Sequence, residues 1–128
     1  MIPFAEYTQH DGLGLAALVR RGELGAAELL ETAIARIEAH NPALNAIIAT
    51  DVEGARKRAR AADRALARKQ VWGPLHGVPM TIKDSLDTAG TITTGGTIGR
   101  KAFVPGEDAT VVADGLAWSE AHGHARRQ

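Results

Sequence analysis

Apolar positions in the first forty residues recur at helical spacing. Residues 12–20 form a short apolar segment. After Arg21 and Gly22, a second segment repeats apolar positions three and four residues apart, which predicts a helix with one buried stripe. We expect this helix to stop at His40-Asn41-Pro42, because the residue before a proline is disfavoured in a helix. The stripe consists of Leu29, Leu30, Ala33, Ile34 and Ile37.

The pattern then changes to a β-rich apolar run from Leu44 to Thr50, which predicts a strand. Thr50 and Glu53 have the spacing of a capping box, so the next helix should begin there. One face of that helix is apolar and the other is densely basic. The basic face comprises Arg56, Lys57, Arg58, Arg60, Arg64 and Arg68.

This basic face has two interpretations. It could bind nucleic acid, or it could be a solvated helix side balanced by Asp51, Glu53 and Asp63. No aromatic residue interleaves with it, as stacking on single-stranded bases would require. We therefore favour the solvated side and expect no nucleic-acid partner.

Glycines and prolines punctuate short β-branched runs between Gly73 and Gly106, which predicts strands and ordered loops. The string MTIKDS places Lys83 at the end of an apolar strand. A final helical segment should begin near Asp108, a suitable N-cap ahead of Ala109 and Val111.

Composition narrows the class of protein. The chain has 128 residues, which favours one domain, with 15 basic and 15 acidic residues and no cysteine. Disulfides and thiolate chemistry are therefore excluded. No apolar run approaches the length needed to span a bilayer, and the start lacks the pattern of a signal peptide. We expect a cytoplasmic protein with no membrane partner.

Lys83 is the candidate catalytic residue, and we expect its amine to be partly buried near Ser85 or the loop of residues 93–96. A buried lysine is either paired or has its pKa lowered by desolvation, and a neutral lysine is a general base that can activate a serine nucleophile. The alternative is that Lys83 pairs with Asp84 or Asp87, or reaches water from the strand end. Spacing alone favours this alternative.

Other candidate functional residues have weaker support. His122 and His124 could coordinate a metal, but no carboxylate cluster accompanies them in the sequence, so no metal site is expected. His76 is expected to hydrogen-bond its own turn. The spacing of Gly90, Gly95, Gly96 and Gly99 does not match a phosphate-binding loop.

The string GPLHGVPMTIKDSLDTAGTITTGGT resembles the N-terminal part of the amidase signature family. That family runs G-P-L-H-G-V-P, an apolar strand, K-D, and then D-x-A-G and T-T-x-G. The preceding RRGELGAAELLETAIARIEAHNPALNAIIA and the following FVPGEDATVVA are also similar to it. The resemblance covers about residues 12–113 of one partial domain, between an N-terminal arm at 1–11 and a divergent tail at 114–128.

The resemblance implies a partial α/β fold: N-terminal helices plus the first strands of a mixed sheet. It also implies cleavage of carboxamide C–N bonds by a Ser–cis-Ser–Lys triad without a cofactor, and Lys83 stands where the family has its catalytic lysine. The only serines, Ser85 and Ser119, match neither catalytic serine. Apart from the resemblance, Asp84 and Asp87 could form a carboxylate pair, but we expect them to orient loop amides and Lys83.

The tail departs from the family pattern. Residues 114–128 lose the apolar periodicity and include Gly115 and Gly123, as a truncation or frameshift would produce, and we expect them to pack poorly. Two functions follow: an amidase piece that is inactive alone, or a non-catalytic remnant or partner-binding protein. The partners expected are a small carboxamide, if the site is completed, and further copies of the chain through open sheet edges.

Overall fold

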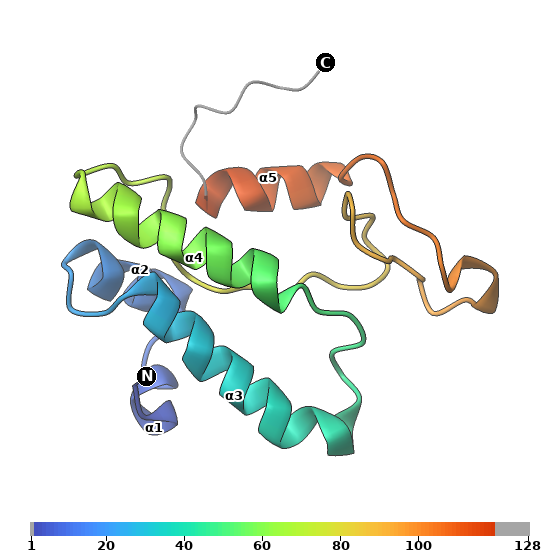
Figure 1. The fold of residues 1–128 in the computed structure, drawn as a ribbon, viewed down its shortest axis with the longest axis horizontal. Coiled ribbons are helices and arrows are strands. Elements are labelled where there is room, and N and C mark those ends of the chain that lie inside the picture. Colours follow the sequence, from blue (N-terminus) through green and yellow to red (C-terminus); the bar gives the residue numbers. More distant parts are fainter. Residues whose placement is uncertain (1, 120–128) are drawn as a thin grey trace.

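The computed structural model describes the backbone of residues 2–119 and the side chains of residues 2–116. This part of the chain is helical, with long irregular segments between the helices (Figure 1). The elements are α1 (Phe4–Tyr7), α2 (Gly12–Arg20), α3 (Ala26–Leu44), α4 (Val52–Ala67), the short 3-10 helix η1 (Ile98–Arg100) and α5 (Thr110–Ser119).

Helices α2 and α3 form where the apolar spacing predicts them. Asp11 caps α2, because its carboxylate accepts a hydrogen bond from the Gly14 N–H at 2.7 Å. Helix α3 has Gly25 at its N-cap and so lacks a local capping side chain. The Asp63 carboxylate of α4 accepts from the N–H groups of Ala26 and Ala27 instead, at 2.7 and 3.1 Å.

Helix α3 continues past Pro42, so the predicted stop at residues 40–42 is wrong. Pro42 lies in the last turn, and the helix ends at Asn45, which adopts the left-handed conformation with φ 49°. The Asn41 side chain bonds both backbone groups of Ile47 at 2.8 Å. These bonds hold the chain beyond the proline against the end of the helix.

Helix α4 is capped by Asp51 and not by the predicted Thr50, since the Asp51 carboxylate accepts from the Gly54 N–H at 2.9 Å. Its basic face is balanced differently from the prediction. Arg56 pairs with Glu31 of α3 at 2.7 Å and with Glu53 at 3.0 Å. Of the predicted counter-charges, Glu53 forms an ion pair with the basic face, whereas the carboxylates of Asp51 and Asp63 cap helices.

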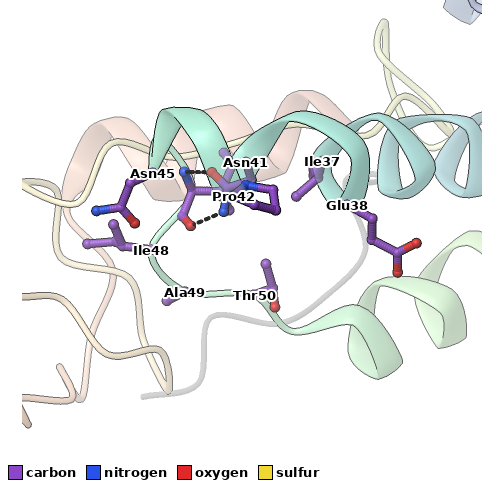
Figure 2. Close-up of a pocket in the computed structure, with 9 residues that line it drawn as sticks. Ile37, Glu38, Asn41, Pro42, Asn45, Ile48, Ala49 and Thr50 are labelled. Atoms are coloured by element: carbon purple, nitrogen blue, oxygen red, sulfur yellow. Dashed lines mark hydrogen bonds between the residues drawn. The ribbon is translucent and has the colours of Figure 1, made fainter.

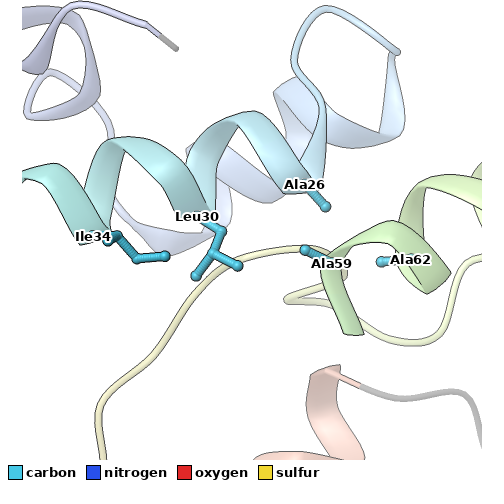
Figure 3. Close-up of a cluster of buried hydrophobic side chains, with 5 residues drawn as sticks. All are labelled: Ala26, Leu30, Ile34, Ala59 and Ala62. Carbon is cyan, nitrogen blue, oxygen red and sulfur yellow. The ribbon is translucent and has the colours of Figure 1, made fainter. Parts of the chain in front are cut away.

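Two apolar clusters hold the helices together. Figure 3 shows the first, in which Leu30 and Ile34 of α3 face the small side chains of α4. The second cluster joins the N-terminal residues and α2 to α3 and brings in Leu66 and Val78 at its edge. The buried members are Ala26, Leu30, Ile34, Ala59 and Ala62 in the first cluster, and Ile2, Leu15, Val19 and Leu29 in the second.

The predicted strands over 44–50 and ending at Lys83 do not form in the part of the chain that the structure describes. A strand requires a neighbour for its backbone groups. At Ile47 the Asn41 side chain takes both groups, and the backbone of residues 79–82 makes no hydrogen bond to any described residue. Because the described residues form no strand, they provide no open sheet edge for the predicted self-association.

Helix α5 begins at Thr110, close to the predicted start. Asp108 is not its capping side chain, because the carboxylate accepts from the Ala89 N–H at 2.7 Å. Residues 114–119 of the predicted divergent tail continue this helix, and residues 120–128 lie outside the described part of the chain. None of the helices described is long and apolar enough to cross a bilayer.

Candidate functional site

Lys83 lies in the irregular segment between α4 and η1. It is exposed, so the expected partial burial is not observed. Its side chain borders a small groove of about 200 Å³ between this segment and α5. The other lining residues are mostly apolar: Met80, Thr81, Ile82, Leu86, Val111, Val112 and Gly115. Lys83 thus stands beside an apolar surface in contact with water.

A buried turn fixes the start of this segment. His76 is fully buried, and its ring accepts a hydrogen bond at Nδ1 from the Trp72 N–H at 3.1 Å. Its Nε2 lies 3.2 Å from the Ala62 carbonyl of α4, to which the neutral ring donates. Burial lowers the pKa of His76. The predicted bond within its own turn is confirmed, and a bond to α4 is added.

Gly77, next in the sequence, allows the turn to approach α3 closely. Its φ is +79°, and an added Cβ would lie 2.9 Å from the Ala26 Cβ and 3.1 Å from a Val19 methyl carbon. A side chain here would be strained in its backbone and would collide with the core. His76 and Gly77 of the GPLHGVP string therefore fix the chain against the helices, and Gly77 lies six residues before Lys83.

Asp84, adjacent to Lys83, organises the loop that follows. Its carboxylate accepts hydrogen bonds from the Thr94 N–H at 2.8 Å, from the Thr94 hydroxyl and from the Gly96 N–H at 3.2 Å. These bonds, the Thr94 hydroxyl first, hold the pKa of Asp84 below its usual value. Gly95 and Gly96 both have positive φ, which turns their backbone toward Asp84. The prediction that Asp84 orients loop amides is confirmed.

Asp87 has a different role from Asp84, so the two are not a catalytic carboxylate pair. Its carboxylate pairs with Arg100 of η1 at 2.6 Å, and its backbone carbonyl accepts from the Ala109 N–H at 2.8 Å. Neither aspartate is paired with the Lys83 amine among the described residues. Asp84 thus connects the start of this loop to Thr94, and Asp87 connects it to η1 and to the residue before α5.

The other candidates are not brought to Lys83. Ser85 is exposed and makes no hydrogen bond to a described residue. Ser119 is the last residue of α5, and its side chain is outside the described set, as are His122 and His124. Within the described residues no three acidic, histidine or cysteine side chains gather where they could hold a metal.

The structure adds residues that sequence reasoning missed. The loop of residues 93–96 was expected near Lys83, and Thr94 supplies two of the donors to Asp84. Val111 and Val112 form the far wall of the groove and were not expected there. Their distance from Lys83 along the chain gave no indication that they would meet it.

A larger cavity of about 470 Å³ lies elsewhere, at the end of α3 (Figure 2). It lies between the last turns of α3, including Ile37 and Pro42, and the chain from Ile47 to Thr50. The Asn41 amide is already bonded to Ile47. Glu38 is the one titratable group in its lining, so the cavity offers little chemistry.

Comparisons with known proteins show which proteins this chain is similar to. The chain is 41% identical over 97 residues to a glutamyl-tRNA(Gln) amidotransferase subunit of Streptomyces coelicolor. It is 38% identical over 104 residues to indoleacetamide hydrolase of Bradyrhizobium diazoefficiens. These matches cover 76% and 81% of this chain but 20% of each relative. The chain thus spans about a fifth of the length of these relatives.

A solved structure is similar as well. The crystal structure of a bacterial aryl acylamidase of the amidase signature family superposes with a TM-score of 0.79 at 26% identity, covering 88% of this chain and 24% of that one. The fold class is therefore the α/β fold of amidase signature enzymes, from which the described residues contribute helices and loops. The family model described as Amidase matches residues 28–115, and the chain belongs to that family.

Proposed function

We propose that this chain contributes the base lysine to an amidase that cleaves the C–N bond of small carboxamides. One observation carries the proposal: Lys83 directly precedes Asp84, which fixes the Thr94–Gly96 turn, so a lysine is presented beside an apolar groove on an ordered loop. The two relatives named above are, by name, a hydrolase of an acetamide and a component of an amidotransferase, which is consistent with this chemistry.

In the proposed mechanism Lys83 acts with two serines. The neutral amine takes a proton from a bridging serine, which in turn takes the proton of the nucleophilic serine. The nucleophile attacks the carbonyl carbon, the C–N bond breaks, and ammonia leaves with the returned proton. Water then hydrolyses the acyl-enzyme to release the carboxylate. Donors for the oxyanion would be needed in the same site.

The chain's own serines do not fit these roles. Ser85 is close to Lys83 in sequence, but it stands outside a glycine- and serine-rich loop, and Ser119 lies in the divergent tail. Both catalytic serines and the oxyanion donors would therefore come from sequence that is not among these 128 residues. The substrate is proposed only as a carboxamide, because the groove beside Lys83 is too small a part of a pocket to select one.

The alternative is a non-catalytic protein that binds a partner. The two are separated by whether residues 28–115 support Lys83-dependent ammonia release when they replace the matching stretch of a complete amidase. The purified 128-residue chain is assayed on a panel of simple carboxamides beside its Lys83→Ala and Ser85→Ala variants. We expect no turnover from any of the three, since a lone amine without nucleophile and oxyanion donors lacks most of the acceleration. Turnover lost in both variants would contradict this and make Ser85 the nucleophile of a minimal enzyme.

A further inference from the structure

Four residues of the basic face form a row along α4. They are three and four residues apart, so their side chains leave the same side of the helix, over about 16 Å at a rise of about 1.5 Å per residue. All four are exposed. Figure 3 shows Ala59 and Ala62 facing α3, on the other side of the helix. This basic row consists of Lys57, Arg60 and Arg64 of α4 and Arg68 at its C-cap.

The carboxylates expected to balance this row are used elsewhere. Asp51 caps α4 itself, and Asp63 caps α3 by accepting from two N–H groups. Glu53 forms its ion pair with Arg56, which is not a member of the row. Within the described part of the chain, the basic row therefore has no ion pair with the acids that the sequence offered it.

The basic row also repels itself. Arg64 stands four residues from both Arg60 and Arg68, and like charges at this spacing destabilise a helix. Glu31 of α3 lies near Arg60, but both of its carboxylate oxygens accept hydrogen bonds from Arg56. A solvated helix face gains nothing from such a row. An anionic ligand that follows the row would offset the repulsion.

The surroundings of the row favour one class of ligand. None of the large exposed apolar side chains in the described chain belongs to α4. A protein interface needs apolar anchors at its centre, and a helix on a membrane surface needs an apolar side to insert. In this structure the apolar side of α4 packs on α3. Contacts to the phosphate backbone of a nucleic acid require neither feature.

We infer that the basic row binds the phosphate backbone of a nucleic-acid duplex without reading its sequence. Guanidinium groups suit phosphate oxygens, because their planar fork donates two parallel hydrogen bonds. The expectation of no nucleic-acid partner assumed that the three carboxylates balance the row. The absence of interleaved aromatic residues argues against single strands and not against a duplex. The row lines no part of the groove beside Lys83, so this inference does not depend on the proposed function.

Fluorescence anisotropy of a labelled DNA duplex tests the inference. The full 128-residue chain is titrated into two unrelated sequences, each of about 20 base pairs. Four phosphate contacts predict a slope of about −3.6 for the logarithm of the association constant against that of the salt concentration. Affinity should thus fall about a hundredfold from about 50 to 200 mM salt, equally for both sequences. No binding at the lower salt concentration, or a slope near zero, would overturn the inference.

Single variants locate the contact. Arg64→Gln removes the central cation of the row and should reduce the slope by about one. Lys101→Gln is the matched control, because Lys101 is exposed, carries the same charge and lies outside α4, and its slope should be unchanged. The urea midpoint of Arg64→Gln should not fall, since two like-charge pairs are removed with the arginine. Equal slopes for the two variants would show that the row does not bind the duplex.

Other polyanions test the class of ligand. Vesicles that contain anionic lipid, and poly-glutamate, are titrated at the same salt concentrations. We expect both to bind at least about tenfold more weakly than the duplex, because neither presents a fixed line of phosphates. Binding of either one as tight as that of the duplex, and weakened in Arg64→Gln, would assign the row to that class of partner and overturn the nucleic-acid inference.

Discussion

At the scale of single residues, the Asp84 carboxylate determines the geometry beside Lys83. It bonds two backbone N–H groups and one hydroxyl ten to twelve residues further along the chain. The Lys83 side chain makes no such contact to a described residue, so its placement depends on its neighbour. The effect of Asp84 on the order of this loop can therefore be measured without an enzymatic assay.

Asp84→Asn should loosen this loop. The amide side chain keeps one carbonyl oxygen for the Thr94 N–H but loses the charge and the second acceptor. We expect the amide hydrogens of Thr94 and Gly96 to exchange with solvent roughly tenfold faster, as measured by NMR. Asp87→Asn is the matched control, since its carboxylate pairs with Arg100 instead. Unchanged exchange in Asp84→Asn would show that the carboxylate does not hold the loop.

At the scale of elements, His76 connects the turn before Lys83 to α4. Its two ring nitrogens are both used by backbone groups in the neutral form, with Nδ1 as the acceptor. Protonation would put a hydrogen on Nδ1, facing the Trp72 N–H. Asp63 and Arg20 also lie near the ring and have opposite effects on its pKa. Burial is the largest effect and lowers the pKa of His76.

This lowered pKa sets the sign of a pH dependence. A histidine that is neutral in the fold contributes stability that is fully present above its ordinary pKa of about 6.5 and is lost as the pH falls toward its folded value. We expect the urea midpoint of unfolding to decrease between about pH 7 and pH 5.5. His76→Gln should flatten that decrease, while His40→Gln, at an exposed position of α3, should not. A midpoint independent of pH in this range would contradict the neutral tautomer.

Elements that depend on local pattern were predictable from the sequence. The apolar stripe of Leu29, Leu30 and Ile34 indicated α3, and all three side chains are buried. Asp84 was correctly expected to orient loop amides, and it bonds the N–H groups of Thr94 and Gly96. In both cases the decisive residues are close in sequence or share a known motif.

Elements that depend on distant contacts were not predictable. Asp63 caps α3 from α4, more than thirty residues away, and no spacing rule reports such a contact. The end of α3 was placed too early: Pro42 lies in the last turn of the helix, and Asn41 bonds Ile47 beyond it, a contact that the local effect of a proline does not report. The strands were predicted from β-rich runs, but a run becomes a strand only where a neighbour pairs with it.

At the scale of the whole molecule, the chain matches a helical and loop portion of the α/β fold of amidase signature enzymes. It covers 24% of the aryl acylamidase chain and superposes on that part with a TM-score of 0.79. Lys83, the loop ordered by Asp84 and one apolar wall lie together. The central hypothesis is that Lys83 is the base of an amidase site.

The most direct measurement is amide hydrolysis by a chimera. Residues 28–115 replace the matching stretch of the Bradyrhizobium diazoefficiens indoleacetamide hydrolase, and ammonia release is followed for the chimera, for Lys83→Met and for Lys101→Met. We expect an active chimera, a loss of kcat/KM of about a hundredfold or more in Lys83→Met, as for removal of a general base, and little change in Lys101→Met. Activity in Lys83→Met equal to that of the chimera would show that Lys83 is not the base.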